Sequence, residues 1–342
     1  MLPKRPAAAP WWRERAASFV AACFLAAGTL PACSARAQAD DPRQLVGHSD
    51  NIYQLAFDPR GRWLASASGD HTVVLWDTAS GEPIRRLDHD APVYTVAFDH
   101  GGTLAATGSG DGRVVLWDPT RGCVVSELGR QAGPVYCVAW SPDGALVAAA
   151  GGDAESGDYR CRLWSVERRC LSHELAGHTR AVYGVAFSGD GKFLATTSGD
   201  KSIRLWALPG AEMRAITGHA SDVYRCAFSP DGTRLATASQ DGSICVWSVK
   251  DGTKLTDLRL GEDPVYAVAF SKDGTFLAGV GTDQQLRLWD TGRWSAEAVR
   301  RVSRASLYAV AFAPDGATLV VAGEEPRITI IPMNSLARMK AP

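Results

Sequence analysis

Short runs of alternating apolar and polar residues fill positions 43–331, and they recur with a nearly constant period. Each period contains a run similar to Val-Tyr-x-Val-Ala-Phe that ends on an aromatic residue. These aromatic residues are Phe57, Phe98, Trp140, Phe187, Phe228, Phe270 and Phe312. Their spacings are 41, 42, 47, 41, 42 and 42 residues, so the pattern occurs seven times. Short alternating runs with a fixed period indicate a repeat protein built from strands.

Turn signals divide each period into four predicted strands. Ser-Pro-Asp-Gly occurs at 141–144 and 229–232, and Ala-Pro-Asp-Gly at 313–316. In such turns proline presets φ and glycine supplies a positive φ. Runs such as Thr-Val-Val-Leu-Trp at 72–76 are rich in β-branched and apolar residues. One four-stranded unit alone leaves both faces uncovered, so we expect an all-β protein whose seven sheets pack around an axis.

Other residues keep a fixed distance from the aromatic position. Thirteen residues after it stands an acid: Asp70, Asp111, Asp153, Asp200, Asp241, Asp283 or Glu325. Nineteen residues after it stands a tryptophan in five units: Trp76, Trp117, Trp206, Trp247 and Trp289. Trp164 comes five residues late, after an insert at 154–158, and Ile331 takes the place in the last unit. Nine residues before it stands His48, His89, His178 or His219, and elsewhere Gln131, Gly261 or Ser303.

These Gly-His, Asp and Trp-Asp positions resemble the WD-repeat (WD40) family of β-propellers, over roughly residues 43–331. The resemblance implies a seven-bladed β-propeller with four antiparallel strands in each blade. The repeats are expected at about 43–77, 84–118, 124–165, 171–207, 213–248, 255–290 and 299–331. It also implies that the strand at 43–46 closes the ring beside 327–331. The eleven residues after Ile331 are the alternative, although they start with Pro332, a poor residue for a paired strand.

The resemblance gives the recurring polar residues a structural role. In the family, the aspartate accepts a hydrogen bond from the histidine, the histidine contacts a hydroxyl, and the hydroxyl accepts from the tryptophan N–H. The four predicted sets are His48–Ser66–Asp70–Trp76, His89–Thr107–Asp111–Trp117, His178–Thr196–Asp200–Trp206 and His219–Thr237–Asp241–Trp247. Four copies of one constellation speak against a single active site. The three units without histidine are expected to be softer.

Tyrosine also recurs once in each unit, four residues before the aromatic position. The seven are Tyr53, Tyr94, Tyr136, Tyr183, Tyr224, Tyr266 and Tyr308. The resemblance places them at the narrow mouth of the central channel, where family members commonly bind partners, and tyrosine is common at binding hot spots. The alternative is packing between blades. Asp222 and Arg225 are the charged residues of this mouth. The insert and the positions after it, with Glu155, Asp158 and Tyr159, form either a tolerated insertion or an acidic lip.

Composition narrows the function classes. Charged residues make up 21% of the chain, apolar residues 46%, and the net charge is -1, which excludes a disordered tail and a polybasic nucleic-acid binder. Cys/His metal spacings, EF-hand loops and phosphate-binding glycine motifs are absent from the sequence, so we expect no cofactor and no metal. A non-enzymatic scaffold for a protein or peptide is the favoured function. A propeller that binds glycans or small ligands is the alternative, and an enzyme is the least favoured.

The first 39 residues have the build of an export signal. Lys4, Arg5, Arg13 and Arg15 precede an apolar stretch at 16–32. Cleavage before Asp40 is favoured, which predicts a periplasmic or extracellular protein. Lipidation at Cys33, which would attach it to a membrane, is the alternative, and an uncleaved anchor ranks third. The six later cysteines have irregular spacings, and most are predicted to be small buried apolar residues.

Overall fold

The computed structural model describes residues 42–208, 211–259 and 261–337, so the predicted signal at 1–39 and Cys33 lie outside the described residues. The first strand is β1 (Arg43–Val46). Blade one contains β2 (Ile52–Phe57), β3 (Trp63–Ser68), β4 (Thr72–Asp77) and β5 (Pro83–Asp88). Blade two contains β6 (Val93–Phe98), β7 (Ala105–Ser109), β8 (Arg113–Asp118) and β9 (Cys123–Arg130). Blade three contains β10 (Val135–Trp140), β11 (Leu146–Gly151), β12 (Cys161–Ser165) and β13 (Cys170–Leu175).

The remaining blades follow the same plan. Blade four contains β14 (Val182–Phe187), β15 (Phe193–Ser198), β16 (Ser202–Ala207) and β17 (Ala211–Thr217). Blade five contains β18 (Val223–Phe228), β19 (Arg234–Ser239), β20 (Ser243–Ser248) and β21 (Lys254–Arg259). Blade six contains β22 (Val265–Phe270), β23 (Phe276–Gly281), β24 (Gln285–Asp290) and β25 (Ala296–Arg301). Blade seven contains β26 (Leu307–Phe312), β27 (Thr318–Gly323), β28 (Arg327–Pro332) and β1.

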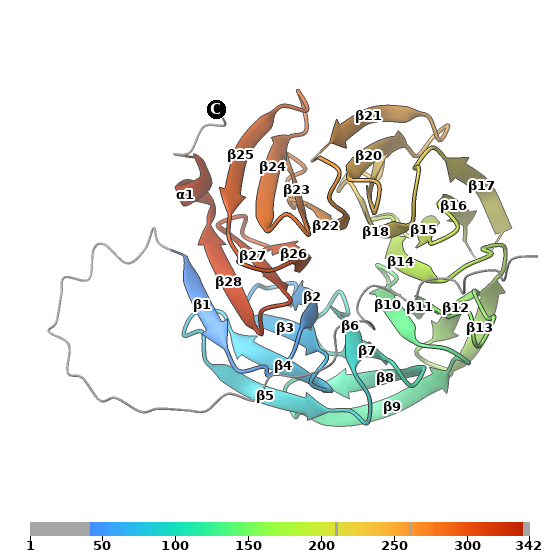
Figure 1. The fold of residues 1–342 in the computed structure, drawn as a ribbon. Helices are drawn as coiled ribbons and strands as arrows, with labels where there is room; N and C mark the ends of the chain where they lie inside the picture. The colour runs from blue at the N-terminus through green and yellow to red at the C-terminus, as the bar shows by residue number, and fades with distance from the viewer. Residues whose placement is uncertain (1–41, 209–210, 260, 338–342) are drawn as a thin grey trace, which may run out of the picture. The chain divides into compact units, whose positions relative to one another are not determined.

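The blades form a closed ring, which confirms the seven-bladed all-β fold (Figure 1). The first strand of each blade lies nearest the axis and contacts the first strand of the next blade, and β26 contacts β2 to complete the circle. Ring closure also follows the prediction, because β1 pairs antiparallel with β28 in the register Gln44↔Thr329 and Leu45↔Ile328. Both ends of the propeller therefore stabilise one blade.

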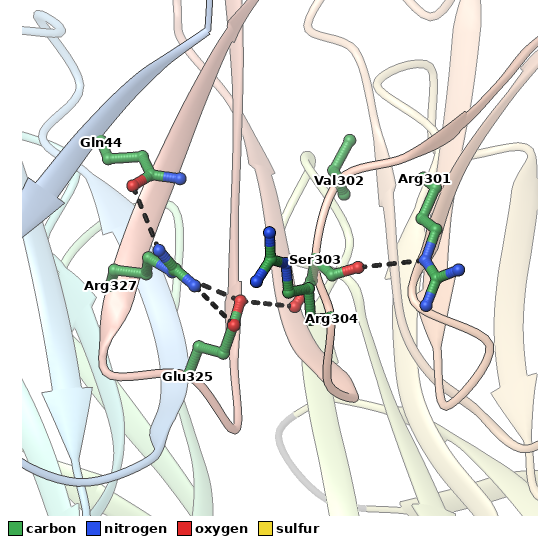
Figure 2. A pocket seen from close by; sticks show the side chains of 7 residues that line it. All are labelled: Gln44, Arg301, Val302, Ser303, Arg304, Glu325 and Arg327. Atoms are coloured by element: carbon green, nitrogen blue, oxygen red, sulfur yellow. Dashed lines mark hydrogen bonds and ion pairs between the residues drawn. The ribbon is translucent and has the colours of Figure 1, made fainter.

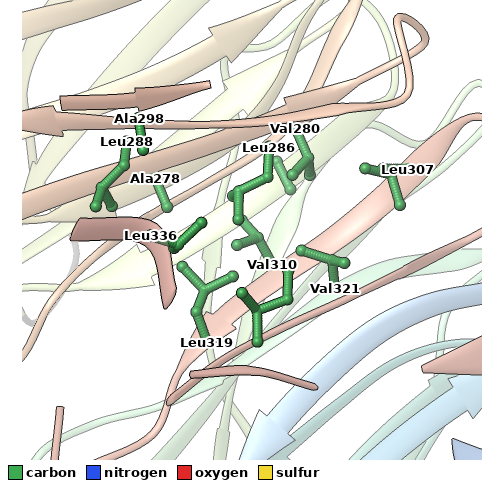
Figure 3. Close-up of a cluster of buried hydrophobic side chains, with 12 residues drawn as sticks. Ala278, Val280, Leu286, Leu288, Ala298, Leu307, Val310, Leu319, Val321 and Leu336 are labelled. Carbon is green, nitrogen blue, oxygen red and sulfur yellow. The ribbon is translucent and has the colours of Figure 1, made fainter. Parts of the chain in front are cut away.

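The core lies between the blades rather than within one sheet. The second strand of each blade is buried on both faces, as in β3 and β15, because neighbouring blades cover both of its sides. Figure 3 shows the cluster between blades six and seven, where Leu286 and Leu288 pack with Val310 and Leu319. Outer strands such as β5 and β13 expose most of their side chains, which explains their polar sequences.

The chain after β28 is helical, which the sequence did not predict. Helix α1 (Met333–Ala337) is a single short turn, and its Leu336 packs into the same cluster beside Leu288 and Leu319. This helix lies against β25 and β28 and forms no strand, so the alternative closure by the C-terminal residues does not occur. Within the described ranges, no helix is long and apolar enough to span a membrane.

Candidate functional site

Three of the four predicted polar sets have all of their hydrogen bonds. In blade four, His178 Nδ1 donates to Asp200 Oδ2 at 2.9 Å, and His178 Nε2 lies 2.8 Å from Thr196 Oγ1. Trp206 Nε1 donates to the same hydroxyl at 2.9 Å. The sets of His48 and His219 have the same bonds within 2.7–3.0 Å. Each set ties the loop before the innermost strand to the second and third strands of its own blade.

Glycine before the histidine lets these sets pack closely. A side chain at Gly47 would put its Cβ 2.8 Å from the Trp76 ring, and one at Gly218 would put it 3.0 Å from the Trp247 ring. Both distances are too short for a Cβ contact. In the sets of His48 and His219 the Gly-His pair thus provides one residue without a side chain, against which the tryptophan packs, and one residue that bonds to it through the shared hydroxyl.

The hydrogen bonds shift the ionisation of the aspartates. Burial alone would raise the pKa of Asp70, Asp200 and Asp241, but hydrogen bonds from histidine, hydroxyl and backbone N–H groups hold it far below its usual value. Burial alone would lower the pKa of His219. Its hydrogen bonds to Asp241 and Cys245 outweigh that effect and raise it to about 9. The three aspartates are therefore ionised throughout the neutral range, and the His219 ring is protonated there.

The set in blade two is incomplete, which corrects the prediction of a fourth full set. His89 Nε2 and Trp117 Nε1 both bond to Thr107 Oγ1 at 2.9 Å, but His89 Nδ1 is buried and, among the described residues, does not bond to Asp111. Asp111 instead accepts from Ser109 Oγ at 2.5 Å and pairs with Arg113 at 3.3 Å. In the complete sets a hydroxyl stands where Arg113 stands. The arginine draws the carboxylate away from the histidine, and burial lowers the pKa of His89.

The blades without histidine use arginine to pair their acids. In blade three the acid that pairs with arginine is Asp158 and not the expected Asp153: Arg162 bonds to Asp158 at 2.6 Å and to Glu174 at 2.9 Å. Asp283 pairs with Arg287 in blade six, and Glu325 pairs with Arg327 at 2.5 Å in blade seven. The lower stability expected of these blades stays a prediction. The ion pairs would reduce the difference in stability from the blades that have a histidine. In blades three and six the sequence signal is an arginine two residues before the tryptophan, although Arg204 shows the same spacing beside a complete set. In blade seven the arginine instead follows the acid by two residues.

The ion pairs also assign a role to the insert in blade three. Asp158 is nearly buried and bonds to both Arg160 and Arg162, so it stabilises the blade and does not form an acidic lip. Glu155 is exposed. Tyr159 packs against the backbone of Gly152 and lies close enough to Tyr183 to influence its ionisation. Tyr159, directly after the insert, thus lies near Tyr183 of the next blade.

The seven predicted tyrosines meet in one unbroken circle at that mouth. Each ring contacts the rings of the two neighbouring blades, with centroids 5.2–5.9 Å apart, and the Tyr53–Tyr308 pair closes the circle. These separations lie in the range of favourable aromatic contacts. We call these seven residues the tyrosine circle. Every blade contributes the same side chain to it.

Burial divides the tyrosine circle into two parts. Tyr136, Tyr183, Tyr224, Tyr266 and Tyr308 are only 3–9% exposed. Tyr53 and Tyr94 are half-buried and present more of their rings to solvent. Burial raises the pKa of Tyr183 to about 12, so its phenol stays protonated. Packing between blades, the alternative in the sequence, therefore accounts for much of the tyrosine contact, and blades one and two hold the accessible part.

Charged residues stand beside the buried part of the circle. Asp222 pairs with Arg180 at 3.1 Å, and burial raises the pKa of Asp222. Arg225 is half-buried, and its Nη1 atom has no hydrogen-bond partner among the described residues. The three residues lie in blades four and five, across the ring from Tyr53 and Tyr94. The mouth thus combines an aromatic side with a charged side.

The cysteines are thiols. Among the described residues all six are free, and Cys137, Cys161 and Cys245 are buried in the apolar strand patterns where the sequence placed them. Burial raises the pKa of Cys161 and Cys226, which keeps these thiols protonated and unreactive. Cys123 and Cys170 are exposed at the starts of outer strands. Within the described ranges, no three His, Cys, Asp or Glu side chains gather in a metal-binding group.

Comparison with known proteins agrees with this geometry. The family model "WD domain, G-beta repeat" matches residues 41–77, 81–118, 122–165, 169–207, 210–248 and 252–290. U3 small nucleolar RNA-associated protein 21 of Saccharomyces cerevisiae is 51% identical over 39 residues, which are 11% of this chain and 4% of that protein. The chain thus spans a small fraction of that relative, about one repeat. The matched ranges stop before blade seven, where Ser303, Glu325 and Ile331 replace the typical residues. The six matches and the seven-bladed ring show that the chain belongs to the WD40 repeat family of β-propellers.

Proposed function

We propose that this protein is a non-enzymatic scaffold that binds a protein or peptide partner on the face where the tyrosine circle opens. WD40 propellers generally bind proteins, which supports the class of function. The tyrosine circle is the observation that supports this face as the binding surface. Side chains that only pack within blades need not meet across all seven blades, whereas this circle brings all seven together and leaves Tyr53 and Tyr94 accessible to a partner.

The partner is expected to contact the aromatic side of the mouth first. Tyr53 and Tyr94 are adjacent, with centroids 5.2 Å apart, and both are partly accessible. Tyrosine supplies a large rigid contact with a polar tip, and the neighbouring buried rings hold these two in place. The polar sets support a scaffold more than an enzyme. Their histidines are held by bonds inside separate blades and do not converge on the mouth.

Selection of peptides on the purified propeller tests this function. Peptides from a displayed random library should bind with affinities that Tyr94→Ala weakens by about 1–2 kcal/mol, the scale of an interface hot spot. Tyr94→Phe keeps the ring face and should retain most of the affinity. Trp63→Ala is the matched control, because Trp63 is a half-buried aromatic residue at the opposite end of blade one.

Two results would overturn the proposal. One is a set of selected peptides that bind the Tyr53→Ala and Tyr94→Ala variants as well as the parent protein while losing affinity for Trp63→Ala. The other is a failure of every peptide, combined with saturable binding of a glycan or a small molecule at the mouth. Thermal melts of each variant separate a lost contact from a lost fold.

We further propose that the protein is exported. The basic residues before position 16 and the apolar stretch at 16–32 support this, and both lie outside the described residues. Mass spectrometry of the native protein should find an N-terminus at Asp40, or a lipidated Cys33. Recovery of the intact chain from Met1 in the soluble cytoplasmic fraction would contradict export.

A further inference from the structure

A basic pocket opens on the same face as the tyrosine circle, between blades six and seven. It has a volume of about 710 Å³ and is lined by Gln44, Arg301, Val302, Ser303, Arg304, Glu325 and Arg327 (Figure 2). We call it the arginine pocket. The loop from β25 to β26, the turn from β27 to β28 and strand β1 form its walls. In blade seven, Ser303 and Glu325 stand on this face in place of the histidine and aspartate of the family pattern.

Most polar groups of the arginine pocket hold one another in place. Glu325 accepts from Ser303 Oγ at 2.9 Å and from Arg327 Nη2 at 2.5 Å. Arg327 also donates to Gln44 Oε1 at 3.3 Å. Arg301 donates to the Ser303 carbonyl at 3.4 Å (Figure 2). The single carboxylate is thus fully engaged, and its position and that of Arg327 are fixed by several bonds.

Arg304 differs from the other charged residues of the pocket. Its side chain is exposed, and no hydrogen bond or ion pair joins its guanidinium to any described residue. Figure 2 shows this guanidinium near Ser303, beside the Glu325–Arg327 pair. Three guanidinium groups and one carboxylate line the pocket, which therefore carries a net positive charge. Arginine presents a planar fork of donors that matches a carboxylate with two parallel hydrogen bonds.

The surroundings limit the kind of anion that fits. Other loops of the same face carry the exposed acids Asp50, Asp90, Glu262 and Asp263. An extended polyanion such as a nucleic acid would run over these acids and be repelled. A short acidic segment can place its charge in the pocket alone.

We propose that the arginine pocket binds carboxylate side chains of a short acidic segment in the protein partner. Arg304 would supply the free donor fork, and Arg301 and Arg327 the supporting charge. This inference rests on the proposed function for its partner class, since it gives the chemistry of one part of that partner. The arginine pocket is separate from Tyr53 and Tyr94, so an experiment can refute one binding site without refuting the other.

Fluorescence polarisation with a labelled Glu-Gly repeat peptide tests the pocket directly. The peptide should bind the parent protein, and Arg304→Ala should weaken binding by about threefold to fivefold, the scale of one exposed ion pair. Arg304→Glu should weaken it further, by about tenfold or more, because it reverses a charge. Arg60→Glu is the matched control, since Arg60 is an exposed arginine at the opposite end of blade one.

A variant with the opposite sign makes the test specific. Glu325→Gln removes the only carboxylate of the pocket while keeping an oxygen that accepts from Ser303, so it should tighten binding of the acidic peptide by about twofold to threefold. A merely structural Glu325 would give no gain. A Lys-Gly repeat peptide should not bind at the pocket. Tyr94→Ala should leave the affinity for the acidic peptide unchanged, which separates this site from the proposed function.

Three outcomes would overturn the inference. In the first, the acidic peptide does not bind the parent protein. In the second, it binds Arg304→Glu and Arg60→Glu with equal affinity. In the third, inorganic phosphate or single-stranded DNA competes at lower concentration than a free Glu-Gly repeat peptide, which would assign the pocket to phosphate groups. Since Arg304 is exposed and makes no side-chain bond, unchanged thermal melts should accompany the loss of affinity in its variants.

Discussion

Replacing Asp200 with alanine should cost far more stability than the same change at Asp111, although the two residues occupy equivalent places. Asp200 accepts from His178 Nδ1 at 2.9 Å, from the Thr179 and Ser202 backbone N–H groups at 3.0 and 2.9 Å, and from the Ser202 hydroxyl at 2.6 Å. The His178 side chain is only 2% exposed. Leaving His178 without its partner inside the blade lowers the free energy of unfolding by about 1–3 kcal/mol. With the more exposed hydrogen bonds included, the expected total loss is about 2–3 kcal/mol.

Asp111 has no histidine to leave unpaired. It holds the buried Ser109 hydroxyl at 2.5 Å and forms a partly exposed pair with Arg113. Loss of the first costs about 1 kcal/mol, and a surface ion pair contributes little, so Asp111→Ala should cost about 1 kcal/mol in all. The expected difference between the variants is therefore about 1–2 kcal/mol, which is well within the resolution of urea unfolding curves.

Urea unfolding of both variants at neutral pH measures the difference. Double-mutant cycles add a second criterion: combining Asp200→Ala with His178→Phe should show a coupling of about 1–2 kcal/mol, and combining Asp111→Ala with His89→Phe should show almost none. Equal losses for the two aspartates, or equal couplings in the two cycles, would refute the view that the histidine bond makes the polar set a stabilising unit.

Three further predictions use the same contacts. The pKa of Asp200 is depressed in the folded protein, so its contribution to stability should be present above about pH 4 and disappear as the pH falls further. Asp200→Asn should therefore weaken the fall in unfolding free energy measured between pH 5 and pH 2. The pKa of His219 is raised to about 9, so its contribution should be complete below about pH 6.5 and fade as the pH rises through 9, which an NMR titration of the ring would follow. Gly129→Ala should destabilise by about 1–3 kcal/mol in thermal melts, because its Cβ would lie 2.1 Å from the Trp164 ring, whereas Gly101→Ala, with its nearest neighbour at 3.4 Å, should not.

The arginine pairs show how far the spacing of residues can carry a prediction. The positions of the acids follow from the repeat except in blade three, where Asp158 pairs in place of Asp153. The histidine that pairs with Asp70, Asp200 and Asp241 follows from the repeat as well. The partner of Asp111 does not follow, because the choice between His89 and Arg113 depends on which side chain reaches the carboxylate in the folded turn. Which side chains form a pair depends on the distances between them in the folded blade, whereas the spacing along the sequence only shows which residues belong to the same blade.

The sequence by itself determined the number of blades and the four strands in each, because these depend on periodicity and on pairing between neighbouring segments. The closure by residues 43–46 was predicted from the resemblance to the WD-repeat family, and the pairing of β1 with β28 confirms it. It also located the seven tyrosines. Only the tertiary structure decided that five of them are buried and that Tyr53 and Tyr94 remain accessible, since closing the ring brings side chains from distant repeats within 5.2–5.9 Å of one another. The arginine pocket likewise exists only in the fold, because Gln44 and Arg327 lie nearly 300 residues apart along the chain and meet where the ring closes.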